Sequence, residues 1–239
     1  MSPIPLVQFW DRRTLPPDVA PLVATWTDGE DGLAYRLWSD VEAERFLARH
    51  YGRRARDAYR MAAPAAMRSD LFRYAVLHRH GGVYVDCDVG KAAPLAPVLA
   101  AVRRGIIITG RSKIENDFMF VRAAGDPLMA HLLEAAIANV EARASNNVWA
   151  ATGPGIATFL WREVGGDDPL FAGYDFVDEV DSTAYLIRGH APAYKETDAH
   201  WLVHQKARSI YQRALPIRLR HRIADAKAAV RRLRGAASG

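Results

Sequence analysis

The chain has 239 residues and a formal net charge of +5, and half of its residues are apolar. This is the ordinary composition of a globular protein, and it excludes an intrinsically disordered chain, a collagen and a disulfide scaffold. The single cysteine, Cys87, permits no disulfide within the chain and fits a reducing compartment. We expect neither a signal peptide nor a membrane span, because no apolar run approaches about 20 residues.

Strand and helix patterns alternate along most of the chain. In chain order they are a buried strand over 4–10, a short helix up to 26, a strand over 35–38, helices over 40–51 and 64–80, strands over 83–89, 105–109 and 117–123, helices over 127–143 and 154–164, and a short strand over 185–188. Ser39 and Glu42 form a capping box, and Gly52 is predicted to end the helix that follows. Strands alternating with helices predict an α/β fold with a largely parallel sheet.

The last predicted element is a basic helix. Residues 206–239 hold 10 Lys or Arg and one acidic residue, so they carry +9 and the preceding residues carry −4. A mildly acidic body argues against a nucleic-acid partner. We therefore expect two parts, a globular domain over 1–205 and a basic helical tail over 206–239.

Apolar residues in this tail recur at helical spacing. They are Pro216, Leu219, Ile223, Ala226, Val230 and Leu233. Steps of three and four place them on one stripe of a helix, with most arginines off the stripe. Two interpretations stay open. The stripe docks on the body, or residues 216–234 lie on an anionic membrane, where each basic residue contributes about 1 kcal/mol.

The strand predicted over 83–89 carries a pair of carboxylates. Alternate side chains of a strand share a face, so Tyr84, Asp86 and Asp88 face one side and Cys87 lies on the apolar side. Two adjacent carboxylates repel unless a cation lies between them or one of them holds a proton. Oxygen ligands with open positions suit Mg²⁺ or Mn²⁺ shared with a diphosphate. The alternative is a pair of solvated loop aspartates.

The preceding helix contributes two more charged residues. Asp70 and Arg73 lie one helical turn apart on one face. Arg73 is suited to clamp a phosphate or a sugar hydroxyl, and Asp70 to accept hydrogen bonds from sugar hydroxyls. The alternative is an exposed ion pair within the helix, worth less than about 1 kcal/mol.

These residues form a recognisable block. Asp70-x-x-Arg73-Tyr74, followed by Gly81-Gly82-Val83-Tyr84-x-Asp86-x-Asp88, resembles the Asp-x-Asp sugar-binding region of a glycosyltransferase family. The family includes bacterial capsular-polysaccharide transferases, fungal outer-chain mannosyltransferases and clostridial glucosylating toxins. Residues 4–10 and 35–40, Asn116-Asp117-Phe118 and Thr152-Gly153-Pro154 also match, in the family's order. The resemblance covers roughly residues 4 to 205.

The resemblance implies a GT-A-type fold, with a mostly parallel central sheet flanked by helices, in a catalytic domain over 1–205. It implies metal-dependent transfer of a sugar, with retention, from a nucleotide diphosphate-sugar to a glycan or lipid-linked glycan. A UDP-sugar is the favoured donor and a GDP-sugar the alternative, and surface polysaccharide synthesis is the expected role. We expect a cytoplasmic protein, peripheral on the inner face of the plasma membrane.

The resemblance also gives roles to single residues. Asp86 and Asp88 would hold Mn²⁺ or Mg²⁺, or the ribose and sugar of the donor, and Asp70 and Arg73 would grip the sugar. Tyr84 would line the donor pocket. Arg73 and the metal would stabilise the departing diphosphate.

Three further positions follow from the flanking matches. Trp10 would lie against the nucleotide base, with a core aromatic as the alternative, and Asn116 would sit near the reacting carbon. In Asp198-Ala199-His200-Trp201, His200 would be a third metal ligand and Trp201 an aromatic over the donor. The Ser-Trp pair with which the family often closes is absent. Since no carboxylate is clearly placed as a nucleophile, we favour attack on the leaving group's side.

Two other functions remain open. A haloacid-dehalogenase-type phosphatase would use Asp86 as nucleophile, with Thr109, Lys113 and Asp167-Asp168 completing its site. A sugar-binding subunit would keep the fold without turnover.

Overall fold

The computed structural model of the protein describes residues 3–27, 32–197 and 199–236, with side chains described up to residue 230. A six-stranded sheet forms its centre. In spatial order the strands are β2 (Leu33–Ser39), β1 (Ile4–Trp10), β3 (Gly82–Val85), β6 (Lys113–Val121), β5 (Gly105–Gly110) and β7 (Tyr174–Asp178). β1 runs parallel to β2 and β3, and β5 to β7, whereas β6 is antiparallel to both of its neighbours. The predicted α/β fold with a mostly parallel sheet is confirmed.

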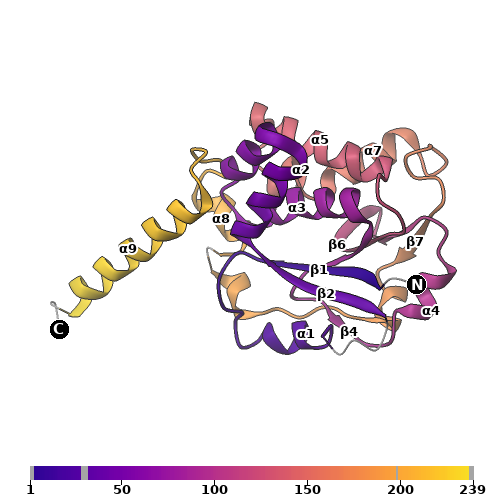
Figure 1. Ribbon diagram of the computed structural model, residues 1–239, viewed down its shortest axis with the longest axis horizontal. Helices are drawn as coiled ribbons and strands as arrows, with labels where there is room; N and C mark the ends of the chain where they lie inside the picture. Colours follow the sequence, from indigo (N-terminus) through magenta and orange to yellow (C-terminus); the bar gives the residue numbers. More distant parts are fainter. Residues whose placement is uncertain (1–2, 28–31, 198, 237–239) are drawn as a thin grey trace.

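Helices cover both faces of the sheet (Figure 1). One face carries α2 (Asp40–Met61), α3 (Ala65–His80), α5 (Pro127–Ala142), α6 (Val148–Ala151) and α7 (Pro154–Val164). The other carries α1 (Ala20–Ala24), α4 (Ala96–Ala101) and a two-stranded sheet of β4 (Gly90–Lys91) and β8 (Leu186–Ile187). The remaining elements are the 3₁₀ turns η1 (Asp181–Ala184) and η2 (Ala193–Glu196), and helices α8 (Trp201–Ala207) and α9 (Ile217–Ala236). None of the helices in the described ranges has the length and apolar character of a membrane span.

β3 shows how the sheet separates two apolar cores and where the functional turn begins. Val83 and Val85 pack into the core on the α4 side, and Tyr84 packs into the core beneath the large helices. The strand predicted to run to residue 89 ends at Val85, because the chain turns over Asp86–Val89, closed by a hydrogen bond from the Val89 N–H to the Asp86 carbonyl oxygen at 3.1 Å. Asp86 and Asp88 therefore lie on a turn rather than on one face of a strand.

Two glycines fix the local path of the chain, one in β3 and one within α2. A side chain at Gly82 would come within 2.3 Å of the Pro5 carbonyl oxygen, so only glycine allows β3 to pair so closely with β1. Gly52 has a φ of 78° and breaks α2, as its position after the predicted helix indicates. The helix resumes beyond it to Met61, a second segment that the sequence analysis missed.

A buried ionic cluster joins α2, α3 and α9. Asp40 is fully buried, and its Oδ1 accepts hydrogen bonds from Arg68 Nε at 2.8 Å and from the Tyr59 hydroxyl at 2.5 Å. His221 Nε2 lies 3.2 Å from its Oδ2. Burial opposes the charge, but Arg68 and the hydrogen bonds outweigh it and lower the pKa of Asp40 to about 2. Asp40 is thus an anion that anchors three helices.

We expect Asp40→Asn to lower the free energy of unfolding by about 3–5 kcal/mol at neutral pH, because Arg68 loses its buried counter-charge. The unfolded carboxyl titrates near pH 4, so the stabilisation by ionised Asp40 is fully present above about pH 4 and is lost as the pH falls through about 2. Urea unfolding at neutral pH and near pH 3 would therefore show a smaller difference between wild type and variant in acid. Asp225→Asn, at an exposed position of α9, is the control, expected within about 0.5 kcal/mol of wild type. If the stability difference between wild type and Asp40→Asn were the same at both pH values, Asp40 would not be the ionised anchor described here.

Candidate active site

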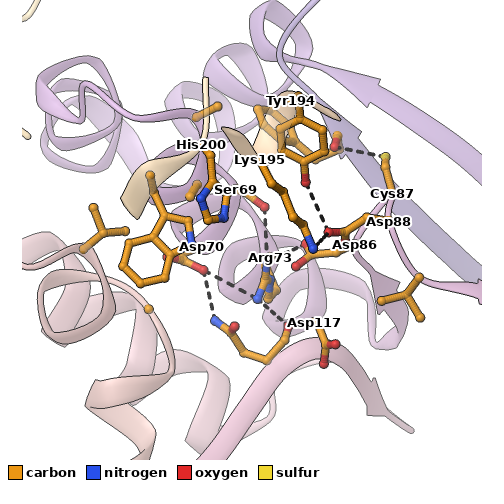
Figure 2. Close-up of a pocket in the computed structure, with 18 of the residues that line it drawn as sticks. Ser69, Asp70, Arg73, Asp86, Cys87, Asp88, Asp117, Tyr194, Lys195 and His200 are labelled. Carbon is orange, nitrogen blue, oxygen red and sulfur yellow. Dashed lines mark hydrogen bonds and ion pairs between the residues drawn. The ribbon is translucent and has the colours of Figure 1, made fainter. Parts of the chain in front are cut away.

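A cavity of about 780 Å³ opens where β1 and β3 end and β6 begins (Figure 2). Its walls include Trp10 at the end of β1, Asp70 on α3, Asn116 on β6 and side chains from 188–197 and 199–201. The carboxyl ends of parallel strands are where open α/β sheets bind ligands. The predicted residues Asp70, Arg73, Asp86, Asp88 and Asn116 all line this one cavity.

Arg73 is the buried cation of the site. Its side chain is 3% exposed, and its Nη2 donates to Asp86 Oδ1 at 2.8 Å and to Ser69 Oγ at 3.2 Å. Its Nη1 donates to the Asn116 carbonyl oxygen, and the guanidinium stacks over the Tyr84 ring. The Nε–H is buried without a hydrogen-bond partner among the described residues. Arg73 is thus held mainly by the protein itself and fixes the Asp86 carboxylate in place.

Asp70 forms the floor of the cavity with both oxygens engaged. Asn116 Nδ2 donates to its Oδ1 at 3.0 Å, and the Thr152 hydroxyl donates to its Oδ2 at 2.9 Å. Burial raises the pKa of Asp70, with Arg73, 3.5 Å away, acting against this shift. The sequence analysis did not predict the contact between Thr152 and Asp70. The match of Thr152-Gly153-Pro154 to the family was the one signal in the sequence that pointed to Thr152.

The Asp-x-Asp pair occupies the turn after β3. Burial raises the pKa of Asp86 to about 7; Arg73 opposes this shift, while the nearby carboxylates of Asp88 and Asp117 add to it. Asp88 Oδ2 accepts a hydrogen bond from the Tyr194 hydroxyl at 3.1 Å and lies 2.7 Å from Lys195 Nζ. Figure 2 shows these side chains meeting from two distant segments of the chain. The turn therefore concentrates negative charge on one wall.

Residues 188–197 and 199–201 supply side chains that the sequence analysis missed. Arg188 Nη2 pairs with Asp117 Oδ2 at 2.7 Å, and Tyr194 stands edge-on to Trp10 with ring centroids 5.5 Å apart. Because much of this segment is irregular, no periodicity marks it, and only its mixture of aromatic and basic residues hinted at a site. It closes one side of the cavity over Asp88.

The structure corrects two predicted roles. Tyr84 does not line the cavity: it is fully buried beneath the helix layer, with its hydroxyl 2.6 Å from Ser69 Oγ and donating to Asp86 Oδ1 at 3.3 Å. Its strand position directs it into the core, so it supports Asp86 from behind. His200 lines the cavity, but no three His, Cys, Asp or Glu side chains are grouped as a metal site in the described ranges. His200 instead packs against the rings of Tyr194 and Trp201, so Asp86, Asp88 and His200 do not form a ligand trio.

The remaining predicted residues are placed as follows. Trp10 and Trp201 both line the cavity and are partly buried. Trp10 Nε1 donates to the Thr14 carbonyl oxygen at 3.1 Å, which leaves its ring at the cavity wall. Its role against a nucleotide base stays a prediction. Asp198 lies outside the described residues.

The carboxylates fit a divalent ion shared with a ligand. Asp86 and Asp88 present oxygen donors on one wall. The nearby Asp117 Oδ1 is buried without a hydrogen-bond partner among the described residues and adds negative charge, but Asp117 is not grouped with them as a third ligand. Two carboxylates leave coordination positions open, which suits Mg²⁺ or Mn²⁺ completed by phosphate oxygens. The donor set therefore matches a joint metal–diphosphate site rather than a closed metal centre.

The residues of the phosphatase alternative are dispersed. Asp167 and Asp168 do not line the cavity, and Asp168 Oδ1 accepts a hydrogen bond from the Leu170 N–H at 2.8 Å. The Thr109 hydroxyl donates to the Val177 carbonyl oxygen at 3.4 Å, and Lys113 pairs with Glu115 at 2.6 Å. Lys113 shares the cavity with Asp86, but Thr109, Asp167 and Asp168 do not line it, so the four side chains do not assemble around Asp86.

The fold and the carboxylates of the site agree with the resemblance to glycosyltransferases, and comparison with known proteins points the same way. Residues 16–104 match the family described as glycosyltransferase sugar-binding region containing DXD motif. The structure is similar to PaToxG glycosyltransferase, with a TM-score of 0.52 and 13% identity over 88% of this chain and 89% of that chain. This likeness supports the GT-A-type fold.

A curated relative points the same way. Inositol phosphoceramide mannosyltransferase 3 of Schizosaccharomyces pombe is 29% identical over 165 residues, which are 64% of this chain and 43% of the relative. The chain therefore spans less than half the length of that relative. Together the comparisons confirm the resemblance to the Asp-x-Asp glycosyltransferase family.

We expect Arg73→Lys to lower the free energy of unfolding by about 2 kcal/mol or more. An ammonium cannot reach Asp86, Ser69 and the Asn116 carbonyl together, so buried polar atoms lose partners. Arg79→Lys, on an exposed position of the same helix, is the matched control, expected within about 0.5 kcal/mol of wild type. Denaturant unfolding of the two variants measures the difference, and equal stabilities would show that the guanidinium contacts are not needed to hold this wall.

Proposed function

We propose that the protein is a metal-dependent, retaining glycosyltransferase that moves a sugar from a nucleotide diphosphate-sugar to a glycan or lipid-linked glycan. The observation that carries the proposal is the convergence of Asp70, Arg73, Asp86 and Asp88 on one cavity. This cavity stands at the carboxyl ends of β1 and β3, and all four residues lie in the matched sugar-binding region.

The donor would bind along the wall that carries the negative charge. Asp86 and Asp88 would hold Mn²⁺ or Mg²⁺, which when bound neutralises charge on the departing diphosphate. Arg73 keeps the Asp86 carboxylate in position, and Tyr194 and Lys195 hold Asp88 from the opposite side. Trp10 and Tyr194 offer ring surfaces for the base, with a UDP-sugar as the favoured donor and a GDP-sugar as the alternative.

Retention by attack on the leaving group's side agrees with the state of Asp70. A nucleophilic carboxylate needs a free oxygen directed at the sugar carbon. Both Asp70 oxygens instead accept hydrogen bonds, from Asn116 and Thr152. Asp70 and Asn116 are therefore suited to orient the sugar, while the acceptor hydroxyl attacks beside the diphosphate.

The acceptor would enter at the β6 and β7 end of the cavity. Lys113, Glu115, Glu179 and Arg188 line that end, and such charged groups form strong hydrogen bonds with hydroxyls. The curated relative is named for mannosyl transfer to inositol phosphoceramide, which favours a lipid-borne acceptor here. A role in surface polysaccharide synthesis, in the cytoplasm and at the inner face of the plasma membrane, is part of the same proposal.

Donor hydrolysis tests the proposed activity. Purified protein would be incubated with UDP-, GDP- and dTDP-sugars, with Mn²⁺ or with EDTA, and nucleotide release followed. We expect release from one donor, lost with EDTA and lowered at least about a hundredfold in Asp88→Asn, because the charge that holds the metal is removed.

Asp175→Asn, an exposed position on β7, is the matched control and should turn over like wild type. Wild-type turnover in Asp88→Asn would overturn the metal assignment. Phosphate release from simple phosphoesters would favour the phosphatase. Donor binding without turnover, even with glycan acceptors present, would favour a sugar-binding subunit.

The ion pair between Lys195 and Asp88 leads to a prediction about the affinity for Mn²⁺ in the absence of a sugar donor. Its ammonium pairs with Asp88 at 2.7 Å and therefore competes with a divalent ion for that carboxylate. A partly exposed ion pair is worth about 1 kcal/mol, so Lys195→Met should tighten Mn²⁺ binding roughly fivefold. Calorimetric titration measures this, with Lys206→Met on α8 as the exposed control. Unchanged or weaker binding would show that Lys195 does not compete at this site.

A further inference from the structure

Among the described residues, the hydrogen bonds that fasten helix α9 to the body lie near the start of the helix. Ile217 is fully buried, and its N–H donates to Glu44 Oε2 at 3.1 Å. Arg220 donates to the Arg60 carbonyl oxygen, and His221 lies against Asp40. Beyond these contacts the helix projects from the body (Figure 1).

The apolar stripe of α9 lies on the face turned away from the body. Each helical residue rotates by about 100°, so Ile217 and His221 share the anchored face and Leu219 lies on the opposite one. Leu219, Ile223 and Val230 are 43%, 38% and 47% exposed. The interpretation in which this stripe docks on the body is therefore wrong.

Basic residues flank this stripe on both sides. By the same rotation, Arg222 lies about 60° to one side of Leu219, and Lys227 about 80° to the other. Both side chains are exposed, as is Arg218. Asp225 is the only acidic residue in α9. The projecting surface is thus apolar at its centre and positive along its edges.

We propose that α9 docks on an anionic phospholipid bilayer. Its apolar stripe would enter the boundary between headgroups and acyl chains, while Arg222 and Lys227 reach the phosphates. Each basic residue near such a surface strengthens binding roughly fivefold. A second copy of the chain fits less well, because pairing two stripes brings two sets of positive flanks together.

The base of α9 is connected to the active-site cavity. His221 contacts Asp40, Asp40 pairs with Arg68 at 2.8 Å, and Arg68 reaches Asp11 at 3.4 Å. Asp11 lines the cavity. A bilayer-bound α9 would therefore hold the cavity close to lipid-borne acceptors, a consequence that rests on the proposed function, whereas the docking itself does not.

Vesicle flotation of the full-length chain tests the docking. The vesicles would be phosphatidylcholine alone, or phosphatidylcholine with about one third phosphatidylglycerol. We expect binding to the anionic vesicles only, weakened severalfold by raising the salt concentration. Two double variants test the two parts of the surface: Leu219→Gln with Ile223→Gln, and separately Arg222→Gln with Lys227→Gln. Each should lower the vesicle partition constant about tenfold or more. Glutamine keeps helix propensity, so neither pair should unfold α9.

Val180→Gln is the matched control, since Val180 is 74% exposed and follows β7, which lies across the body from α9 (Figure 1). It should bind like wild type, and all variants should keep wild-type donor hydrolysis in solution, which separates failure of docking from failure of the proposed activity. Equal binding to neutral vesicles, no binding to anionic ones, or binding unaffected by both double variants would overturn the proposal. A dimer in sedimentation that the Leu219/Ile223 variant dissolves would assign the stripe to a second copy instead.

Discussion

The site depends on one buried guanidinium. A charge as deeply buried as that of Arg73 is tolerated only when opposite charges and hydrogen-bond acceptors surround it. Asp86, Ser69 and the Asn116 carbonyl meet this need, and they come from the turn after β3, from α3 and from β6. Because all of these groups must reach the Arg73 guanidinium, its hydrogen bonds fix the relative positions of three elements. They thereby position the cavity wall that carries Asp86 and Asp88.

Charge balance then explains why the wall is suited to a cation. Around the Asp86–Asp88 turn, the ion pairs of the described residues join four carboxylates, Asp70, Asp86, Asp88 and Asp117, to three cations, Arg73, Arg188 and Lys195. The remaining negative charge is reflected in the raised pKa of Asp86, caused first by burial and increased by its neighbouring carboxylates. A divalent ion would reverse this imbalance, and a diphosphate would then be attracted to the same wall.

Local signals predicted much of the fold. β1 over 4–10 and α7 over 154–164 match their predicted bounds, and the Ser39–Glu42 capping box is present. The convergence of Asp86 and Asp88 was also predicted correctly, although a turn rather than a strand face produces it. The alternation of strand side chains predicted Tyr84 on the same face as these aspartates. This prediction was wrong, because the strand ends at Val85, before Asp86, and Tyr84 points into the core. What the sequence could not predict is contact over long separations: Tyr194 and Lys195 reach Asp88 from over 100 positions away, through a segment without periodicity.

The single cysteine sits between the two aspartates of the turn. Cys87 is 3% exposed, its Sγ lies 3.3 Å from the Phe9 carbonyl oxygen, and burial together with the flanking carboxylates raises the pKa of its thiol. A neutral, covered thiol reacts poorly with electrophiles. Since the sequence holds no other sulfhydryl, the rate at which a reagent alkylates this protein reports how often the turn between Asp86 and Asp88 opens.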